Sequence, residues 1–224
     1  SRIKLVLQSQ LFYFLFLRHG LQITMEVGMR KKSHISLAKY IVGRVEEQGL
    51  VKHKKAFYLG SILPDCKPSF FTEKHEMEGT FPKLQEELRE LVEGQQKESA
   101  NERAFYRNLG EVLHYIADYF TFPHNAHYTG GLKDHCIYEK HLKKGLREYL
   151  RSGEAERYWE AFQDFMPCLG SIEAVCDYIQ SNHEAYVKLE NTVEGDCRQI
   201  VILCQKVAEA VILLAREEEV LQAA

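Results

Sequence analysis

Apolar residues recur at three- and four-residue intervals along most of the chain, which is the spacing of one face of an α-helix. The clearest example is the last segment, where apolar side chains follow this spacing over residues 200–214. No stretch alternates apolar and polar residues as a half-buried β-strand would. The pattern therefore predicts an all-α fold, a single domain of several packed helices.

Residues that cap or stop helices predict where these helices begin and end. Ser33 and Thr80 are predicted to cap the first helix and a charged amphipathic helix that closes near Gly94. Asn101 begins a long helix that stops before Pro123, because the residue preceding a proline disfavours helical backbone. The remaining expected segments are an apolar run over 56–63 that leads into a loop, a helix over 134–150, and two or three helices within 154–219.

The first 28 residues differ from the rest of the sequence. The apolar run from Leu11 to Leu17 is far shorter than the ~20 residues that span a bilayer, and no small-residue cleavage site follows it. We therefore expect residues 1–28 to be an extension outside the working domain and residues 29–224 to form that domain. We also expect a cytoplasmic protein, with secretion as the alternative, and no transmembrane segment.

Composition limits the classes of function. The chain has 224 residues, 45% of them hydrophobic, which is enough for one domain with a core. The formal net charge is −3 and the lysines and arginines are scattered, so there is no strong nucleic-acid signature. None of the six cysteines forms a Cys-x-x-Cys pair, and Cys176 and Cys204 lie among apolar residues. That setting suits buried free thiols better than a disulfide framework.

Candidate chemistry is concentrated between residues 114 and 139. His114 precedes Asp118 by four residues, so both side chains lie on one face of a helix. His135 and Glu139 repeat this spacing. The first pair falls on an apolar face, where an imidazole and an ionised carboxylate both need partners. A zinc ion would satisfy both residues at once.

Further residues of metal-ligand type lie near these pairs. His124 follows the first pair after five intervening residues, and His127 is the alternative to it if the loop is shifted. Asp65 ends an apolar run at Leu-Pro-Asp, where a turn or a helix cap is an equally good interpretation. His75 and His34, taken alone, would be interpreted as surface residues.

Other catalytic and metal motifs are absent from the sequence. There is no His-Glu-x-x-His protease motif. A di-iron bundle needs two Glu-x-x-His motifs, and only the one from Glu111 to His114 is present. Phosphate-binding loops, dinucleotide fingerprints and Gly-x-Ser-x-Gly elbows are also missing. The acids and histidines above therefore carry the functional argument.

The order of these residues resembles the bacterial zinc-dependent phospholipase C family, whose all-helical fold is shared with fungal zinc nucleases that cut single-stranded nucleic acids. The resemblance covers His34 to Glu139, just under half of the chain. It implies that Asp65 is the carboxylate that orients or deprotonates the attacking water. The implied zinc ligands are His75, His114 and Asp118 for one ion, His124, His135 and Glu139 for a second, and His34, with Asp118 bridging, for a third.

The third ion depends on where the chain begins. The family completes that site with an N-terminal tryptophan, whereas the only tryptophan here is Trp159. A natural start at Met29 would make His34 the sixth residue, a spacing that matches the nuclease branch. The resemblance therefore implies two Zn²⁺ ions and allows a third.

We expect a zinc-dependent phosphodiester hydrolase, most like a phospholipase C, acting on a phospholipid or another phosphodiester with peripheral membrane contact. A single-strand nuclease or nucleotidase of the same fold is the first alternative. Aromatic residues near the motif, such as Tyr115, Tyr119 and Tyr128, would pack a head group, a base or simply the core. The alternative of another class is a non-catalytic zinc-binding helical protein, which would have no need of Asp65.

Overall fold

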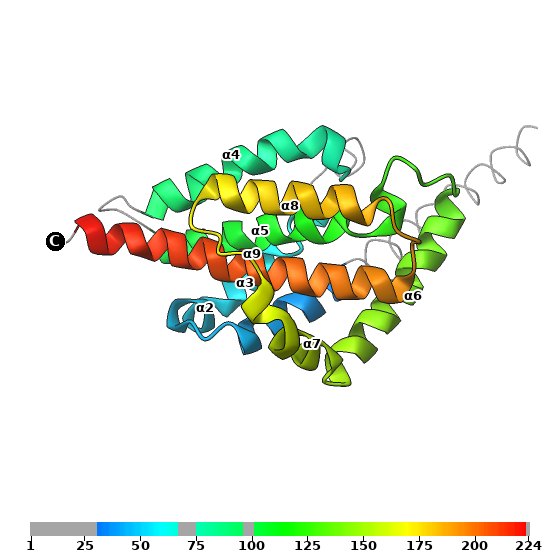
Figure 1. Ribbon diagram of the computed structural model, residues 1–224, viewed down its shortest axis with the longest axis horizontal. Helices are drawn as coiled ribbons and strands as arrows, with labels where there is room; N and C mark the ends of the chain where they lie inside the picture. The colour runs from blue at the N-terminus through cyan, green and yellow to red at the C-terminus, as the bar shows by residue number, and fades with distance from the viewer. Residues whose placement is uncertain (1–30, 67–74, 96–100, 223–224) are drawn as a thin grey trace, which may run out of the picture.

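The computed structural model describes residues 31–66, 75–95 and 101–222, and within these ranges every regular element is helical. The predicted all-α fold is thus confirmed (Figure 1). The α-helices are a first helix that includes residues 31–44, α2 (Gln48–Lys52), α3 (Lys54–Gly60), α4 (Met77–Gln95), α5 (Glu102–Tyr119), α6 (Leu132–Arg151), α7 (Glu154–Phe162), α8 (Ile172–Tyr186) and α9 (Val193–Gln222). The 3-10 turns are η1 (Pro64–Cys66), η3 (Phe122–His124) and η4 (Gln163–Phe165). The extension predicted at residues 1–28 lies outside the described residues and stays a prediction.

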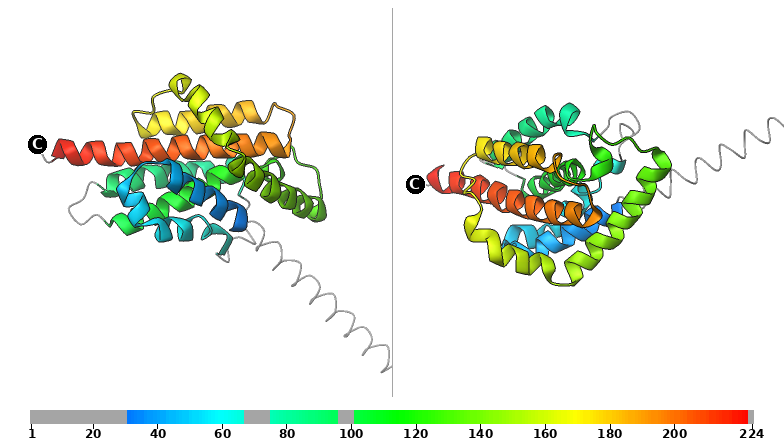
Figure 2. Two further views of the ribbon diagram at one scale, coloured as in Figure 1. Left: turned by 90° about the horizontal axis from the view of Figure 1, so that it is seen from below. Right: turned by 45° about the vertical axis from the view of Figure 1, so that its right-hand side comes forward.

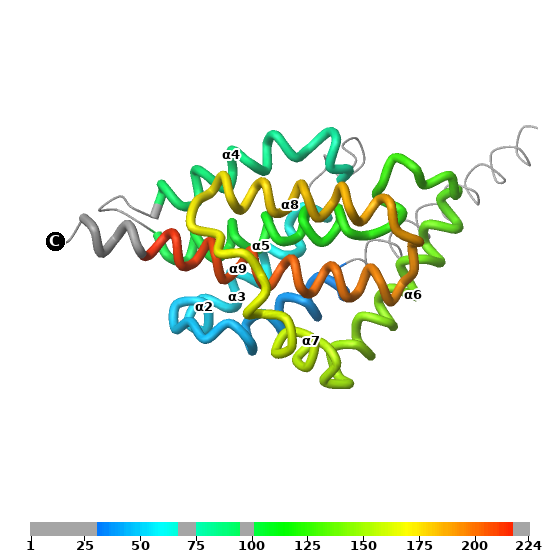
Figure 3. Tube along the Cα trace, viewed as in Figure 1, coloured from blue at the N-terminus to red at the C-terminus, as the bar shows by residue number. Residues whose placement is uncertain are grey.

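Helices α5 and α9 form the centre of the bundle. Helix α5 packs against α3, α4 and α9, and α9 also contacts α6, α7 and α8. Figures 1 and 2 show α4 and α8 on one side of α9, with the helix over residues 31–44, α2 and α3 on the other. The Cα trace in Figure 3 shows α6 running obliquely past the end of the bundle opposite the C-terminus. The core between the two central helices includes Leu109, Ile116, Val207 and Val211, all fully buried.

The predicted start of α5 is confirmed, and that of the first helix is wrong. The Asn101 side chain accepts a hydrogen bond from the backbone N–H of Ala104, as an N-cap does. Ser33, by contrast, lies inside a helix, because residues 31 and 32 are already helical. A serine followed by apolar residues at helical spacing therefore did not mark the start of this helix.

The predicted cap at Thr80 is also wrong, because α4 begins at Met77. The Thr80 hydroxyl donates to the backbone carbonyl of Glu76, 2.8 Å away, and lies 2.8 Å from the hydroxyl of Tyr119 on α5. A hydroxyl that bonds back to the preceding turn and across to another helix is not available as a cap. A tertiary partner thus overrides the local signal.

The expectation of buried free thiols agrees with the structure. All six cysteines are free, and Cys176 and Cys204 are buried as predicted. No helix among the described residues is both long enough and apolar enough to cross a bilayer.

Helices α3 and α5 approach each other backbone to backbone at two glycines. A Cβ atom on Gly60 would overlap the carbonyl oxygen of Arg107. A Cβ atom on Gly110 would overlap the carbonyl oxygen of Phe57 and lie 2.8 Å from the backbone nitrogen of Ser61. This close approach brings the end of α3, and the η1 turn that follows it, against the part of α5 that carries His114.

Gly110→Ala should lower the free energy of unfolding by about 1–3 kcal/mol, because overpacking forces the two helices apart. Gly43→Ala is the matched control, since a Cβ atom there meets no other atom within 4 Å, and it should leave stability unchanged or raise it by up to ~1 kcal/mol. Chemical denaturation measures both. Equal stability of the two variants would contradict the close approach.

Candidate metal centre

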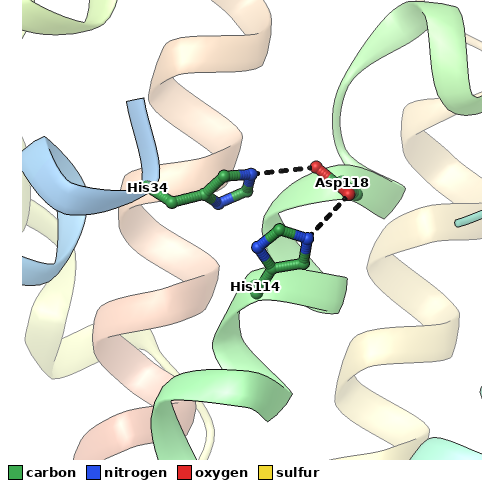
Figure 4. Close-up of side chains that lie close together, drawn as sticks. All are labelled: His34, His114 and Asp118. Carbon is green, nitrogen blue, oxygen red and sulfur yellow. Dashed lines mark ion pairs between the residues drawn. The ribbon is translucent and has the colours of Figure 1, made fainter. Parts of the chain in front are cut away.

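The centre begins with the i, i+4 pair on α5. His114 and Asp118 are 1% and 4% exposed, so both polar side chains are removed from water. The Nε2 atom of His114 lies 3.3 Å from an oxygen of Asp118. Figure 4 shows the two side chains one turn apart on α5, with His34 reaching the same carboxylate from the first helix. The spacing predicted from the sequence thus produces a direct contact.

The two oxygens of Asp118 face different histidines. Oδ2 lies 2.8 Å from Nδ1 of His75 and 3.3 Å from Nε2 of His114. Oδ1 lies 3.3 Å from Nε2 of His34. These histidines come from the first helix, from the segment before α4 and from α5. One carboxylate therefore joins three separate parts of the chain.

Asp65 brings a second carboxylate to the same histidines. It lies in η1 and is 3% exposed, and its Oδ1 is 3.7 Å from Nε2 of His114. Neither Asp65 oxygen has a hydrogen-bond partner within the part of the chain that the structure describes. Asp65, His75 and His114 offer ligand atoms within 4.8 Å of one another, and so do His34, His114 and Asp118. A buried carboxylate without donors calls for a cation.

A further group forms between η3 and α6. Nε2 of His135 lies 2.9 Å, and Nε2 of His124 lies 3.4 Å, from Oε1 of Glu139. The ligand atoms of these three residues also lie within 4.8 Å of one another. Nδ1 of His124 is 4.0 Å from Oδ2 of Asp118, which joins this group to the others. The structure thus gathers all eight predicted residues into one continuous cluster.

The cluster is electrostatically coupled. Burial by itself would raise the pKa of Asp118, but His124, His114 and His34 outweigh it and hold that pKa well below its ordinary value. Burial likewise disfavours a charged His114, yet the attraction of Asp118 and Asp65 raises its pKa above the ordinary value. Without a metal ion, a proton on His114 therefore helps to balance the carboxylates.

Several supporting groups could not be found from the sequence. Nδ1 of His114 lies 2.9 Å from the backbone carbonyl of Ser61, so the ring donates there and leaves Nε2 facing the carboxylates. Next to His124, the buried Asn125 donates to two backbone carbonyls and accepts from Nε2 of His183, 2.8 Å away. A carbonyl and a distant histidine carry no local sequence signal that would connect them to the site.

The other candidate residues from the sequence belong to none of the three groups. His127, the alternative to His124, is exposed and its Nε2 lies 3.1 Å from the Asn191 side-chain nitrogen. It belongs to none of the three groups. Of the aromatic candidates, Tyr119 is fully buried core, whereas the Tyr115 ring packs edge-on against His75, with ring centres 4.9 Å apart.

A pocket adjoins the cluster on its apolar side. Its lining includes His34, Asp118, His124 and Glu139, together with Ser33 and Thr121. The rest of the lining is aliphatic: Leu37, Ala117, Leu142, Leu146 and Ile200. The candidate ligands thus stand at the edge of an apolar pocket, not on an open polar surface.

The donor set fits zinc. Imidazole nitrogens and carboxylate oxygens are the ligands that zinc uses in catalytic sites, and catalytic sites keep a position open. A family model described as zinc dependent phospholipase C matches residues 33–193, more than half of the chain. The chain belongs to this family. No curated protein and no solved structure matched it.

The zinc dependent phospholipase C match includes all eight clustered residues, since it begins just before His34 and runs well past Glu139. The all-helical structure is consistent with the fold of this family. The family is zinc-dependent, and the three groups could hold metal ions. The grouping of Asp65 with His75 and His114 adds a possibility that the sequence did not indicate, namely that Asp65 is itself a ligand.

Zinc binding should release protons, and zinc affinity should rise with pH. The raised pKa of His114 means that the metal-free protein keeps a proton that a metal ligand must lose. The affinity should therefore increase as pH rises through that pKa and level off above it. Calorimetric titration in buffers of different ionisation enthalpy measures the protons released.

The matched variants for this experiment are His114→Gln and His127→Gln. The first removes a candidate ligand, and the second removes a histidine that lies outside all three groups. His114→Gln should release fewer protons and bind zinc more weakly, while His127→Gln should match the unmodified chain. Heats that do not depend on the buffer would contradict the raised pKa of His114, because no proton would then be released on binding.

Proposed function

We propose that this protein is a phospholipase C that hydrolyses phosphodiesters with a cluster of two or three zinc ions. The observation that carries the proposal is Asp118, whose oxygens face His75 and His114 on one side and His34 on the other. A carboxylate placed in this way can bridge two metal ions. His124, 4.0 Å from the same carboxylate, ties the last group to it.

We divide the candidate ligands among the metal ions as follows, with Asp118 shared between two of them. His75, His114 and Asp118 hold one zinc, and His124, His135 and Glu139 hold another. His34, with Asp118 bridging, supports a third. Bound zinc would supply Lewis acidity that activates water and neutralises the phosphoryl oxygens. The backbone carbonyl of Ser61 fixes the tautomer of His114, so that Nε2 is the nitrogen presented to the metal.

Asp65 is the proposed catalytic carboxylate. Its two buried oxygens lack hydrogen-bond donors among the described residues, so the carboxylate is free to accept a proton or to bind a cation. Its place beside His75 and His114 puts it next to the first metal ion. We propose that Asp65 orients or deprotonates water there, and that one of its oxygens also reaches the metal.

The apolar lining beside the cluster favours a lipid over a nucleic acid. Five aliphatic side chains line the pocket beside Asp118 and Glu139, namely Leu37, Ala117, Leu142, Leu146 and Ile200. Among its described lining residues there is no lysine or arginine to follow a phosphate backbone. An apolar wall next to the reactive centre suits a lipid, and a lipid substrate implies peripheral contact with a membrane.

The arrangement also argues against a purely structural zinc protein. A structural zinc has four protein ligands and no open position. Here each compact group offers three ligand residues, and His114 belongs to two groups. The ligands that the described residues offer are therefore too few to close every metal site, which would leave positions for water and a phosphoryl oxygen.

Asp65→Asn should lower kcat for phosphatidylcholine by about 10²–10⁴-fold, since a positioned base contributes that much. The amide keeps the size of the side chain but cannot take a proton. Zinc at the His124, His135 and Glu139 group should remain, as measured by elemental analysis. Asp164→Asn, at an exposed acid in η4, is the matched control. An unchanged rate would refute the role of Asp65.

The zinc-loaded protein should release a phosphorylated head group from phosphatidylcholine vesicles and should contain at least two zinc ions per chain. Single-stranded DNA and a chromogenic phosphodiester are the competing substrates. Faster cleavage of DNA than of lipid would favour the nuclease alternative. Full zinc content without hydrolysis of any of the three would favour a non-catalytic protein, and fewer than two ions would refute the cluster.

A further inference from the structure

Asp196 is a buried acid that the proposed chemistry does not use. It lies in the first turn of α9 and is 0% exposed. One oxygen, Oδ2, accepts hydrogen bonds from the backbone N–H of Phe122 and the hydroxyl of Tyr138, each 2.8 Å away. The other, Oδ1, accepts from the hydroxyl of Tyr186 at 2.7 Å. All three donors are neutral.

Two of these donors belong to the segments that carry candidate ligands. Phe122 begins the η3 turn that ends at His124. Tyr138 immediately precedes Glu139 on α6 and follows His135 by three residues. The third donor, Tyr186, ends α8, which contributes no residue to the three groups. Asp196 therefore ties both ligand-bearing segments to the central helix α9.

A carboxylate is the side chain that this position requires. A carboxylate is acceptor-only, so both of its oxygens can receive donors at once, whereas an asparagine would turn its own N–H toward one of them. Burying the charge is costly, and no lysine or arginine in the described ranges forms an ion pair with Asp196. Burial accordingly raises the pKa of Asp196 to about 6, with the three hydrogen bonds opposing it. We take the free energy of burying this charge as a sign that Asp196 fixes the position of the groups that donate to it.

We propose that Asp196 is a positioning residue that holds His124, His135 and Glu139 in place for their metal ion, through Phe122 and Tyr138. The inference rests on the proposed zinc function. Asp196 lies beyond the segment that matches the family, which ends at residue 193. The hydrogen bonds that Asp196 accepts come from Phe122, Tyr138 and Tyr186, none of which belongs to the groups built on His34, His75 and His114, so the metal held by those groups should respond less to its loss.

Tyr138→Phe and Tyr186→Phe form the test. Each removes one hydroxyl that donates to the same carboxylate, but only Tyr138 lies on a ligand-bearing helix. Competition with a chromogenic chelator measures the affinity of each zinc. The ion of interest is identified as the one missing from Glu139→Gln. Tyr138→Phe should lower the binding affinity for that ion by about 10–100-fold, which is the effect typical of losing a group that hydrogen-bonds near a metal ligand.

Tyr186→Phe should leave all zinc affinities within about threefold of the unmodified chain. It should lower the melting temperature about as much as Tyr138→Phe does. Asp196→Asn should behave like Tyr138→Phe, and the absorption spectrum of Co²⁺ bound at the same group should change with both. Equal loss from all metal sites, or equal effects of the two tyrosine variants, would reduce the network to a structural one and overturn the proposal.

The failure of this proposal is distinguishable from that of the proposed function. A chain that binds zinc but hydrolyses no phosphodiester would refute the activity alone, since the chelator measurement needs only bound metal. A chain that binds no zinc would refute both. Selective loss of one ion in Tyr138→Phe would support Asp196 whichever substrate is cleaved.

Discussion

The structure depends on keeping one carboxylate ionised inside a helical bundle. Asp118 is almost fully buried, and a charge in that position is stable only when positive or hydrogen-donating groups surround it. His34, His75 and His114 meet this requirement from three parts of the chain, and His124 approaches from a fourth. Taken alone, His34 and His75 would be interpreted as surface residues. Around Asp118 they become mutually necessary, so the charge balance of one residue determines which helix ends must converge.

This convergence is possible because two helices approach each other at glycines, where no side chain keeps their backbones apart. Gly60 and Gly110 let α3 lie directly on α5, and the η1 turn then delivers Asp65 to the same imidazole that the Ser61 carbonyl orients. Helix α9 supplies no candidate ligand, yet through Asp196 it holds the segments that carry His124, His135 and Glu139. The centre is thus supported by backbone contact on one flank and by a buried hydrogen-bond network on the other.

Periodicity was enough to predict the helices and the two i, i+4 pairs, because both depend on local geometry. The choice of His124 over His127 followed from spacing, and the structure places only His124 in the cluster. Ser33 and Thr80 misled, since a capping residue type also bonds back to the preceding turn, as Thr80 does to Glu76. Asp196 could not be recognised, because an acid in the first turn of a helix is ordinary. Its donors lie on three other segments, and only the folded chain brings them together.

The three groups differ in how much chain they enclose. The ligands His124, His135 and Glu139 lie within 16 residues, in η3 and the start of α6, whereas the other groups draw on residues from 34 to 118. Closing a longer loop costs more entropy, and distant contacts form later in folding. The short-range group can therefore form early, but it reaches its final geometry only when α9 packs and Asp196 accepts from Phe122 and Tyr138. Its ion would then report that α9 has docked, whereas the ions of the other groups would report that the first helix has docked.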